Sequence, residues 1–205
     1  ITICKYMKIL IIDNYDSFTF NLYQIIGELL FSFENNGHVV DVKRNDEITL
    51  DEIKKENYDR IIISPGPGDA RDQNYFGICG QVLTQVSKTT PTLGVCLGMQ
   101  GIAFYYGGDI KQLEIPVHGK THEVVHDEKG IFKGLPQNLE VMRYHSLMVD
   151  SKSVPDCLEI TARIESGEIM GFRHKEYPIV GVQFHPESFA TEGGIQMLKN
   201  FLFQE

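Results

Sequence analysis

The chain has 205 residues, 42% of them hydrophobic and 23% charged, which is enough for one compact domain with a substantial core across residues 1–205. Its 28 acidic residues outnumber 19 Lys and Arg, and the formal charge of −9 repels phosphate backbones and anionic lipid. Nucleic acid and membrane surfaces are therefore poor partners. The apolar runs fall far short of the roughly 20 residues needed to cross a bilayer, so we expect a cytoplasmic protein.

The cysteines form neither a metal-binding nor a disulfide pattern. Four of them are widely spaced, and no CxxC pair occurs, so neither a zinc knuckle nor a disulfide framework is indicated. They are Cys4, Cys79, Cys96 and Cys157. Residues 1–6 precede the first strand pattern, and we interpret them as an N-terminal addition to which no function is assigned.

Strands and helices alternate in the first half of the chain. Short apolar segments predict strands at 7–13, 38–43, 60–64 and 92–95. Helices are expected at 50–57, 76–86 and 99–106, and a further helix after Ser17, which is placed to cap it. Alternation of this kind predicts a parallel sheet with helices on both faces.

After Asp109 the helical periodicity disappears. Short β-rich segments follow at 139–142, 158–163, 169–173 and 179–183. They succeed one another directly, so we expect antiparallel additions to the sheet. Segment 192–203 predicts an amphipathic helix whose core face includes Ile195, Leu198 and Leu202. The predicted fold is therefore α/β, with an open, mostly parallel central sheet, helices on both faces and antiparallel additions in the C-terminal half.

The sharpest chemical pattern is GVCLG at residues 94–98, where a buried strand meets the start of a helix. It matches the G-x-nucleophile-x-G elbow, with sulfur in place of a hydroxyl. The glycines allow a tight turn, and the helix N-terminus favours a thiolate and offers backbone N–H groups. Cys96 is therefore predicted to be a nucleophile. The alternative is a small buried cysteine in a glycine-rich turn.

His185 and Glu187 follow the strand at 179–183. In extended backbone, residues two apart point to the same side, so the carboxylate can lie beside the imidazole. There it would fix the tautomer and stabilise the imidazolium. A solvated loop histidine is the alternative, but the Cys96 elbow favours a catalytic pair.

The segment SPGPG at 64–68 also follows a predicted strand, at the edge where open α/β sheets bind ligands. Glycines flanked by prolines make a rigid loop whose bare backbone can offer N–H groups to an oxyanion. A plain turn is the alternative. Phosphate binding is not indicated, because the G-x-x-x-x-G-K-[ST] pattern is absent.

In this order and at these strand ends, the three segments resemble the class I glutamine amidotransferases from Met7 to the C-terminus. The resemblance is strongest to the glutaminase subunits of chorismate-using synthases. It is carried by LIIDNYDSFTF (10–20), SPGPG (64–68), GVCLGMQ (94–100), HGKT (118–121), RYHSL (143–147) and GVQFHPES (181–188). The family implies a flavodoxin-like arrangement of the sheet.

The resemblance implies a role for each matched residue. Cys96 would be the nucleophile, His185 the general base and acid, and Glu187 the residue that orients the imidazole. Gly66 and the backbone of Leu97 would form the oxyanion hole. The glutamine would be held by the remaining matched residues, which are Pro67, Gly68, Gln100, Ser146 and Leu147.

Two departures from the family pattern are local. Met99 stands where a histidine is common, and Asp69-Ala70-Arg71 replaces the usual Thr-Pro after the glycine loop. Neither removes a member of the implied triad.

The resemblance also implies partners. L-Glutamine would be the substrate, and the ammonia would pass to a chorismate-using synthase subunit that makes anthranilate for tryptophan or, as second choice, aminodeoxychorismate for folate. No cofactor or metal is expected in this subunit, whereas the partner synthase is expected to depend on Mg²⁺. One rival is a γ-glutamyl hydrolase, which works alone and normally carries a secretion signal. A non-catalytic binding subunit is disfavoured by the complete triad.

One competing motif is HEVVH at 122–126, which matches the H-E-x-x-H pattern of zinc metalloproteases. That chemistry needs a helix, which places both histidines on one face. Val124 and Val125, with glycines nearby, instead favour a strand or turn. In a strand the two histidines would lie about 13 Å apart, too far for one zinc ion.

Overall fold

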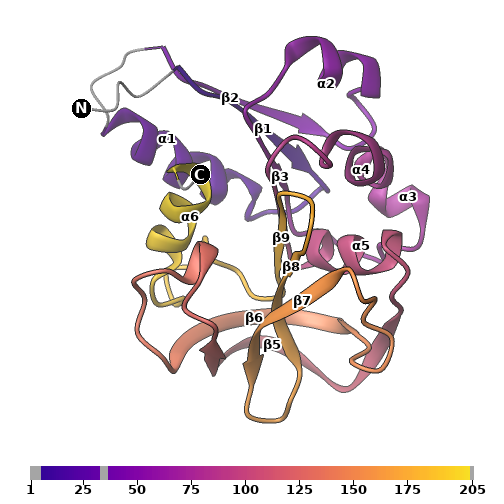
Figure 1. Ribbon diagram of the computed structural model, residues 1–205, viewed down its shortest axis with the longest axis vertical. Coiled ribbons are helices and arrows are strands. Elements are labelled where there is room, and N and C mark those ends of the chain that lie inside the picture. The colour runs from indigo at the N-terminus through magenta and orange to yellow at the C-terminus, as the bar shows by residue number, and fades with distance from the viewer. Residues whose placement is uncertain (1–5, 33–36, 204–205) are drawn as a thin grey trace.

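The computed structural model describes residues 6–32 and 37–203, so Cys4 and most of the predicted N-terminal addition lie outside the described residues. One nine-stranded sheet has the strand order β2-β1-β3-β4-β9-β8-β7-β5-β6, and it runs through the middle of the molecule (Figure 1). Within the described ranges, no helix is both long and apolar enough to span a membrane.

Five neighbouring strands of the sheet are parallel, as predicted for four of them. The segment at 179–183 was expected to be an antiparallel addition, and this is wrong, because it lies parallel to its neighbour at 92–95 and fills the sheet between the parallel and antiparallel parts. The parallel strands are β1 (Lys8–Asp13), β2 (Val39–Arg44), β3 (Arg60–Ile63), β4 (Thr92–Val95) and β9 (Ile179–Val182). The run from Ile9 to Ile12 in β1 is fully buried, because both faces of the strand are covered. Alternate residues enter two separate cores, with Ile9 and Ile11 in one and Leu10 and Ile12 in the other.

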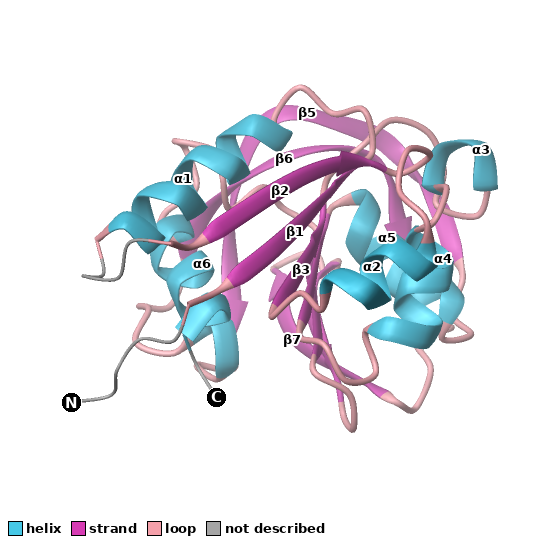
Figure 2. Cartoon of the chain, turned by 90° about the horizontal axis from the view of Figure 1, so that it is seen from above, coloured by secondary structure: helices cyan, strands magenta, loops and turns pink. Residues whose placement is uncertain are grey.

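Helices cover both faces, which confirms the α/β prediction. The first core packs against α1 (Thr19–Phe31) and α6 (Gly194–Phe203). The second packs against α2 (Leu50–Glu56) and α5 (Leu97–Tyr105), together with the short helices between β3 and β4. Figure 2 shows these two groups on opposite sides of the strands.

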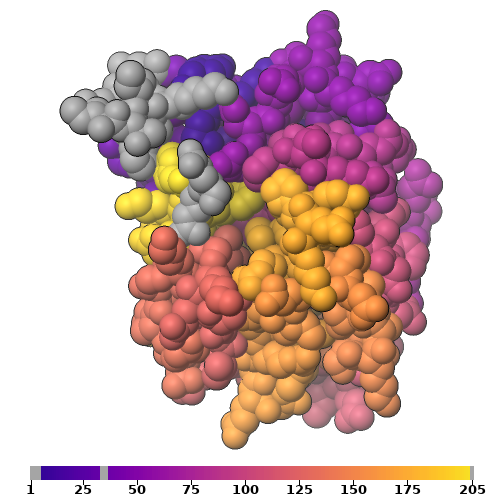
Figure 3. Space-filling model, in the orientation of Figure 1, coloured from indigo at the N-terminus to yellow at the C-terminus, as the bar shows by residue number. Residues whose placement is uncertain are grey.

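The other part of the sheet is antiparallel, as predicted for the segments at 139–142, 158–163 and 169–173. It contains β5 (Ile110–His126), β6 (Leu139–Val149), β7 (Leu158–Ile164) and β8 (Ile169–His174), and β8 joins it to β9. In Figure 3 this salmon-to-orange half packs directly against the indigo-to-magenta half. The 17-residue length of β5 was not predicted, because most of its side chains are exposed and carry no apolar alternation.

The predicted helix at 76–86 is wrong as a single element. The segment divides into α3 (Gln73–Phe76), α4 (Cys79–Gln81) and a π-helical turn at Val82–Val86. The break lies at Gly77, whose φ of +47° suits glycine and whose added Cβ would lie 2.4 Å from the carbonyl oxygen of Asn45. Contact with the loop after β2 therefore ends α3.

Two smaller predictions about helix ends and faces are also wrong. Phe18 is the N-cap of α1, and no side chain caps it, so Ser17 does not have the expected role. Ile195 is 60% exposed, whereas Leu198 and Leu202 are buried as expected. Leu198 and Leu202 are one helical turn apart. Ile195 shares their helical stripe but lies in the first turn of α6, so its position at the end of the helix, and not the face it occupies, leaves it exposed.

Candidate active site

Cys96 lies at a tight turn between β4 and α5. Its φ of +52° and ψ of −101° are rare for a residue with a side chain. A Cβ on Gly94 would lie 2.6 Å from the carbonyl carbon of Gly98, and one on Gly98 would lie 2.5 Å from the carbonyl oxygen of Ile63. Both glycines are therefore required for the close approach of α5 to the sheet, and the expected elbow geometry is present.

His185 and Glu187 form a buried pair directly after β9. Their Nδ1 and Oε1 atoms are 2.7 Å apart, and the side chains are only 3% and 0% exposed. Burial lowers the pKa of His185, but the interactions of the imidazolium with Cys96 and Glu187 outweigh it and raise that pKa to about 10. A protonated His185 is the partner that a Cys96 thiolate requires.

The second nitrogen of the same ring is not used by Glu187. His185 Nε2 is buried and has no conventional hydrogen-bond partner among the described residues, and the same holds for Glu187 Oε2. Because Nδ1 is bonded to Glu187, Nε2 is the ring nitrogen left free to exchange a proton with Cys96, whose interaction with the imidazolium helps to raise the pKa of His185. The ring is therefore oriented for proton transfer at Nε2.

Two aromatic side chains, one from the segment after β1 and one from β6, pack against His185. The rings of Phe18 and Tyr144 meet the imidazole edge-on, at centroid distances of 5.8 Å and 5.2 Å, and they stack on each other at 5.4 Å. The segment 14–18, which follows β1, therefore borders the His185 side of the site. These rings exclude water and hold the imidazole in place.

The glycine loop lies beside the start of α5. A Cβ added to Gly66 would lie 2.5 Å from Asn14 Cβ and 2.8 Å from Leu97 Cδ2. Asn14 anchors the loop, because its backbone N–H and its side-chain amide both donate to Ser64, each at 2.9 Å. The structure thus brings together Gly66 and Leu97, the two residues expected to form an oxyanion hole.

The other loop residues are more open. Pro67 and Gly68 are exposed. Gly68 has a φ of +83°, and an added Cβ there would overlap the ring of Tyr75 at 2.3 Å. Glycine is required at this position by conformation and by contact.

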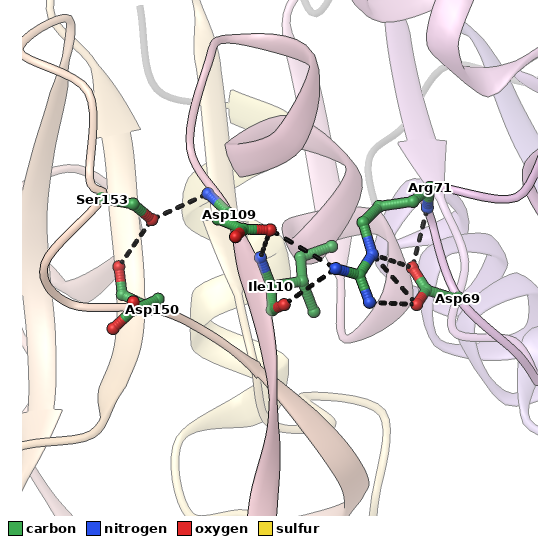
Figure 4. Close-up of polar contacts among 6 residues, drawn as sticks. All are labelled: Asp69, Arg71, Asp109, Ile110, Asp150 and Ser153. Atoms are coloured by element: carbon green, nitrogen blue, oxygen red, sulfur yellow. Dashed lines mark hydrogen bonds and ion pairs between the residues drawn. The ribbon is translucent and has the colours of Figure 1, made fainter.

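The unusual segment Asp69-Ala70-Arg71 has a visible structural role (Figure 4). Arg71 contacts the Asp69 carboxylate at 2.7 Å and donates to the carbonyl oxygen of Ile110 at 3.1 Å, with Asp109 at 3.4 Å. The guanidinium holds the pKa of Asp69 below its usual range. Arg71 therefore ties the end of the glycine loop to the beginning of β5.

Polar groups from α5, from β6 and from the end of β9 converge near the thiol. Gln100 Nε2 donates to the carbonyl oxygen of Leu147 at 2.9 Å and to Gln183 Oε1 at 3.2 Å. Gln183 Nε2 in turn lies 3.5 Å from Cys96 Sγ. Ser146 is exposed beside Leu147. Gln100 and Leu147 are thus brought close to Cys96, as expected for residues that border one pocket.

Gln183 was missed in the sequence analysis, although a signal was present. It is fully buried and lies two residues before His185, so the alternation that pairs His185 with Glu187 also includes Gln183. Met99, one of the two departures, is fully buried in the second core and packs against Gly181. It is a core residue behind the elbow.

The HEVVH segment is part of strand β5, as expected, and its two histidines have different surroundings. His126 Nε2 lies 2.9 Å from the carbonyl oxygen of Pro136, and its ring stacks on Phe132. His122 borders an open groove of about 930 Å³. Across the described residues, no three His, Cys, Asp or Glu side chains are grouped to hold a metal ion.

Comparison with known proteins agrees with this geometry. The family model for class-I glutamine amidotransferases matches residues 10–205. The chain therefore belongs to the class I glutamine amidotransferase family, and it is an enzyme.

Particular relatives are similar over almost the whole chain. Anthranilate synthase component 2 of Leptospira biflexa is 54% identical over 96% of this chain and 99% of its own length. The aminodeoxychorismate/anthranilate synthase component 2 of Bacillus subtilis is 47% identical over 95% of both chains. A solved GMP synthase subunit of Thermoplasma acidophilum superimposes with a TM-score of 0.81 at 26% identity, covering 97% of this chain and 93% of its own.

Proposed function

We propose that this chain is the glutaminase subunit of anthranilate synthase, which hydrolyses L-glutamine to glutamate and supplies ammonia to a chorismate-using subunit in tryptophan biosynthesis. The observation that carries the proposal is the position of Cys96, held at a φ of +52° between a buried strand and a helix, beside the buried His185–Glu187 pair. The names of the full-length relatives from Leptospira and Bacillus support the choice of synthase.

The reaction follows from the positions of these groups. The Cys96 thiolate attacks the side-chain amide carbon of glutamine, and the oxygen that becomes negative is bound by the N–H groups of Gly66 and Leu97. His185, protonated at Nε2, gives its proton to the leaving nitrogen as the C–N bond breaks, and ammonia departs. A γ-glutamyl thioester remains on Cys96.

Water completes the cycle. The now neutral His185 takes a proton from water, and the hydroxide attacks the thioester carbon. The C–S bond breaks, glutamate leaves and the thiolate–imidazolium pair is restored. Glu187 remains ionised and holds the ring through Nδ1, as the acidic member of a triad does. The pocket for the rest of the glutamine would be formed by Pro67, Gly68, Gln100, Ser146 and Leu147.

The ammonia must reach a second subunit without entering bulk water, because it is mostly protonated at neutral pH and then is no nucleophile. The segment 14–18 borders the His185 side of the site, and we assign it to the docking surface for the synthase. The isolated chain is expected to be a poor glutaminase that the partner activates by holding the glycine loop. We expect a cytoplasmic complex in which this chain holds no cofactor and the synthase holds Mg²⁺.

A second candidate is the glutaminase subunit of aminodeoxychorismate synthase, in folate biosynthesis. The Bacillus relative, 47% identical, carries both names, so one chain can serve both synthases. A γ-glutamyl hydrolase is the less favoured alternative, since such an enzyme needs no partner.

The test uses the complex with each chorismate-binding subunit in turn. Cys96→Ala is expected to abolish glutamine-dependent synthesis and to leave synthesis from added ammonium salts unchanged, because only the thiol carries the glutamyl group. Full glutamine-dependent activity of Cys96→Ala would contradict the proposal. The chorismate-binding protein that increases glutamate release by the wild-type chain identifies the synthase.

A further inference from the structure

A buried chain of hydrogen bonds leads from the β7–β8 turn toward the nucleophile. It begins at Glu168, which pairs with Arg143 on β6. The Arg143 side chain is only 1% exposed, although arginine is almost never fully buried unless it is paired. Its Nε donates to His145 Nε2 at 3.0 Å.

This contact determines the tautomer of His145. A guanidinium has donors only, so Nε2 of the imidazole must accept and the proton must be on Nδ1. Nδ1 lies 2.8 Å from the carbonyl oxygen of Leu147 and therefore donates to it. Burial, with Arg143 as second cause, lowers the pKa of His145 to about 4, so the ring is neutral at neutral pH.

The Leu147 carbonyl connects His145 to the site. Its oxygen accepts from His145 Nδ1 and also from Gln100 Nε2 at 2.9 Å, so both lone pairs are used. Gln100 contacts Gln183 at 3.2 Å, and Gln183 Nε2 lies 3.5 Å from Cys96 Sγ. While His145 keeps this tautomer, the donor and the acceptor of each hydrogen bond in the series are fixed.

We propose that His145 is a positioning residue for glutamine hydrolysis: its Nδ1–H fixes the Leu147 carbonyl, and with it the Gln100 and Gln183 amides that form the wall of the pocket beside Cys96. Arg143 and Glu168 in turn hold the His145 ring. The inference rests on the proposed function, because it assigns the pocket to glutamine. It adds a set of residues that lies behind the pocket wall and does not touch the reacting atoms.

Replacing His145 by asparagine or by glutamine removes one of the two hydrogen bonds of the ring and keeps the other. Asn places its amide near the position of Nδ1, so His145→Asn keeps a donor for Leu147 and loses the acceptor for Arg143. Gln reaches the position of Nε2, so His145→Gln keeps an acceptor for Arg143 and loses the donor for Leu147. Both variants are uncharged, so charge does not distinguish them.

The measurement is glutamine-dependent and ammonia-dependent synthesis by the complex. His145→Gln is expected to lower kcat/KM for glutamine at least about tenfold, because a misplacement near 1 Å can cost about 10²-fold, and ammonia-dependent synthesis is unchanged. His145→Asn is expected to stay within about threefold of wild type. His174→Gln is the matched control, since His174 and His145 are both 6% exposed and, within the part of the chain that the structure describes, His174 accepts hydrogen bonds from backbone N–H groups of the β8–β9 turn.

A second readout does not need the partner. His145→Gln is expected to slow the labelling of Cys96 by a glutamine-analogue electrophile at least about tenfold, with little change in labelling by iodoacetamide, which needs no pocket. Glu168→Ala, at the partly exposed outer end of the chain of bonds, is expected to reduce only the analogue labelling, by about threefold. This variant decides the matter if His145→Gln does not fold.

Three results would overturn the inference: unchanged labelling in both His145→Gln and Glu168→Ala, equal losses in His145→Gln and His145→Asn, or a parallel loss of ammonia-dependent synthesis. These outcomes differ from a failure of the proposed function, which would appear as glutamine-dependent activity in Cys96→Ala. An inactive Cys96→Ala beside a fully active His145→Gln would refute the positioning role alone.

Discussion

Replacing Gly66 with alanine tests the oxyanion hole at its most restricted point. The new Cβ would lie 2.5 Å from Asn14 Cβ and 2.8 Å from Leu97 Cδ2, whereas carbon atoms in contact prefer roughly 3.5–4.0 Å. Asn14 is 1% exposed and held by bonds to Ser64 and Asn45, so it does not yield. The glycine loop must therefore move by about 1 Å.

A shift of that size removes the Gly66 N–H from the position of the oxyanion. Loss of one such donor costs about 10² to 10³-fold in rate, so glutamine-dependent kcat should fall by that factor. Crowding should also lower the free energy of unfolding by about 1–3 kcal/mol. Ammonia-dependent synthesis should be unaffected, because it does not use this site.

The assay compares both activities of the complex with the urea denaturation curve of the isolated chain. Gly27→Ala in α1 is the matched control, since a Cβ there would meet nothing within 4 Å and alanine stabilises a helix by about 0.5–1 kcal/mol relative to glycine. Wild-type kcat for glutamine in Gly66→Ala would refute the assignment of the loop, and so would an equal loss of ammonia-dependent activity.

Three further predictions use other parts of the structure. Cys96 should react with a glutamine-analogue electrophile at least about tenfold faster than Cys79, whose burial raises its pKa, or Cys157; mass spectrometry showing first labelling at either of these would contradict the elbow assignment. Arg71→Ala should lower kcat/KM for glutamine about tenfold. Lys111→Ala, which removes a similar surface ion pair nearby, should leave kcat/KM unchanged. Equal kcat/KM in the two variants would rule out the tie from the loop to β5. The pKa of His145 is lowered to about 4 in the folded chain, so between pH 6.5 and 4 the unfolded chain binds a proton that the folded chain does not. The free energy of unfolding should therefore fall as pH falls through this range, by up to about 3 kcal/mol. Its pH dependence, measured by urea unfolding, should be weaker in His145→Asn, and an unchanged slope would argue against a neutral buried ring.

The residues that we propose for the chemistry were predicted from local patterns. The elbow at 94–98 was predicted because its glycines, its buried strand and its helix are contiguous in the chain. The His185–Glu187 contact was predicted because residues two apart in extended backbone share a side, and the structure places their atoms 2.7 Å apart. Four of the five parallel strands were recognised for a similar reason, since a strand buried on both faces is apolar at every position; the exception is β9, which was expected to be antiparallel.

Errors appeared where a distant segment decides the conformation. The helix predicted at 76–86 is interrupted because Gly77 packs against Asn45, 32 positions earlier in the chain. The length of β5 depends on its pairing with β6 and β7, since its own side chains are mostly exposed. The hydrophobic periodicity of a segment does not show which distant residue packs against it or which strands pair with it.

The amino-acid sequence by itself determined the family and the alternation of strands and helices, and it predicted the Cys96 elbow and the His185–Glu187 pair, because each of these depends on residues that are neighbours along the chain or along one strand. Only the tertiary structure decided that Gly66 lies against Leu97, that Arg71 reaches Ile110 and that His145 is linked through Leu147 to Gln100. These contacts join segments from different strands and loops. Their geometry is set by how the sheet packs against its helices, which local sequence patterns do not specify.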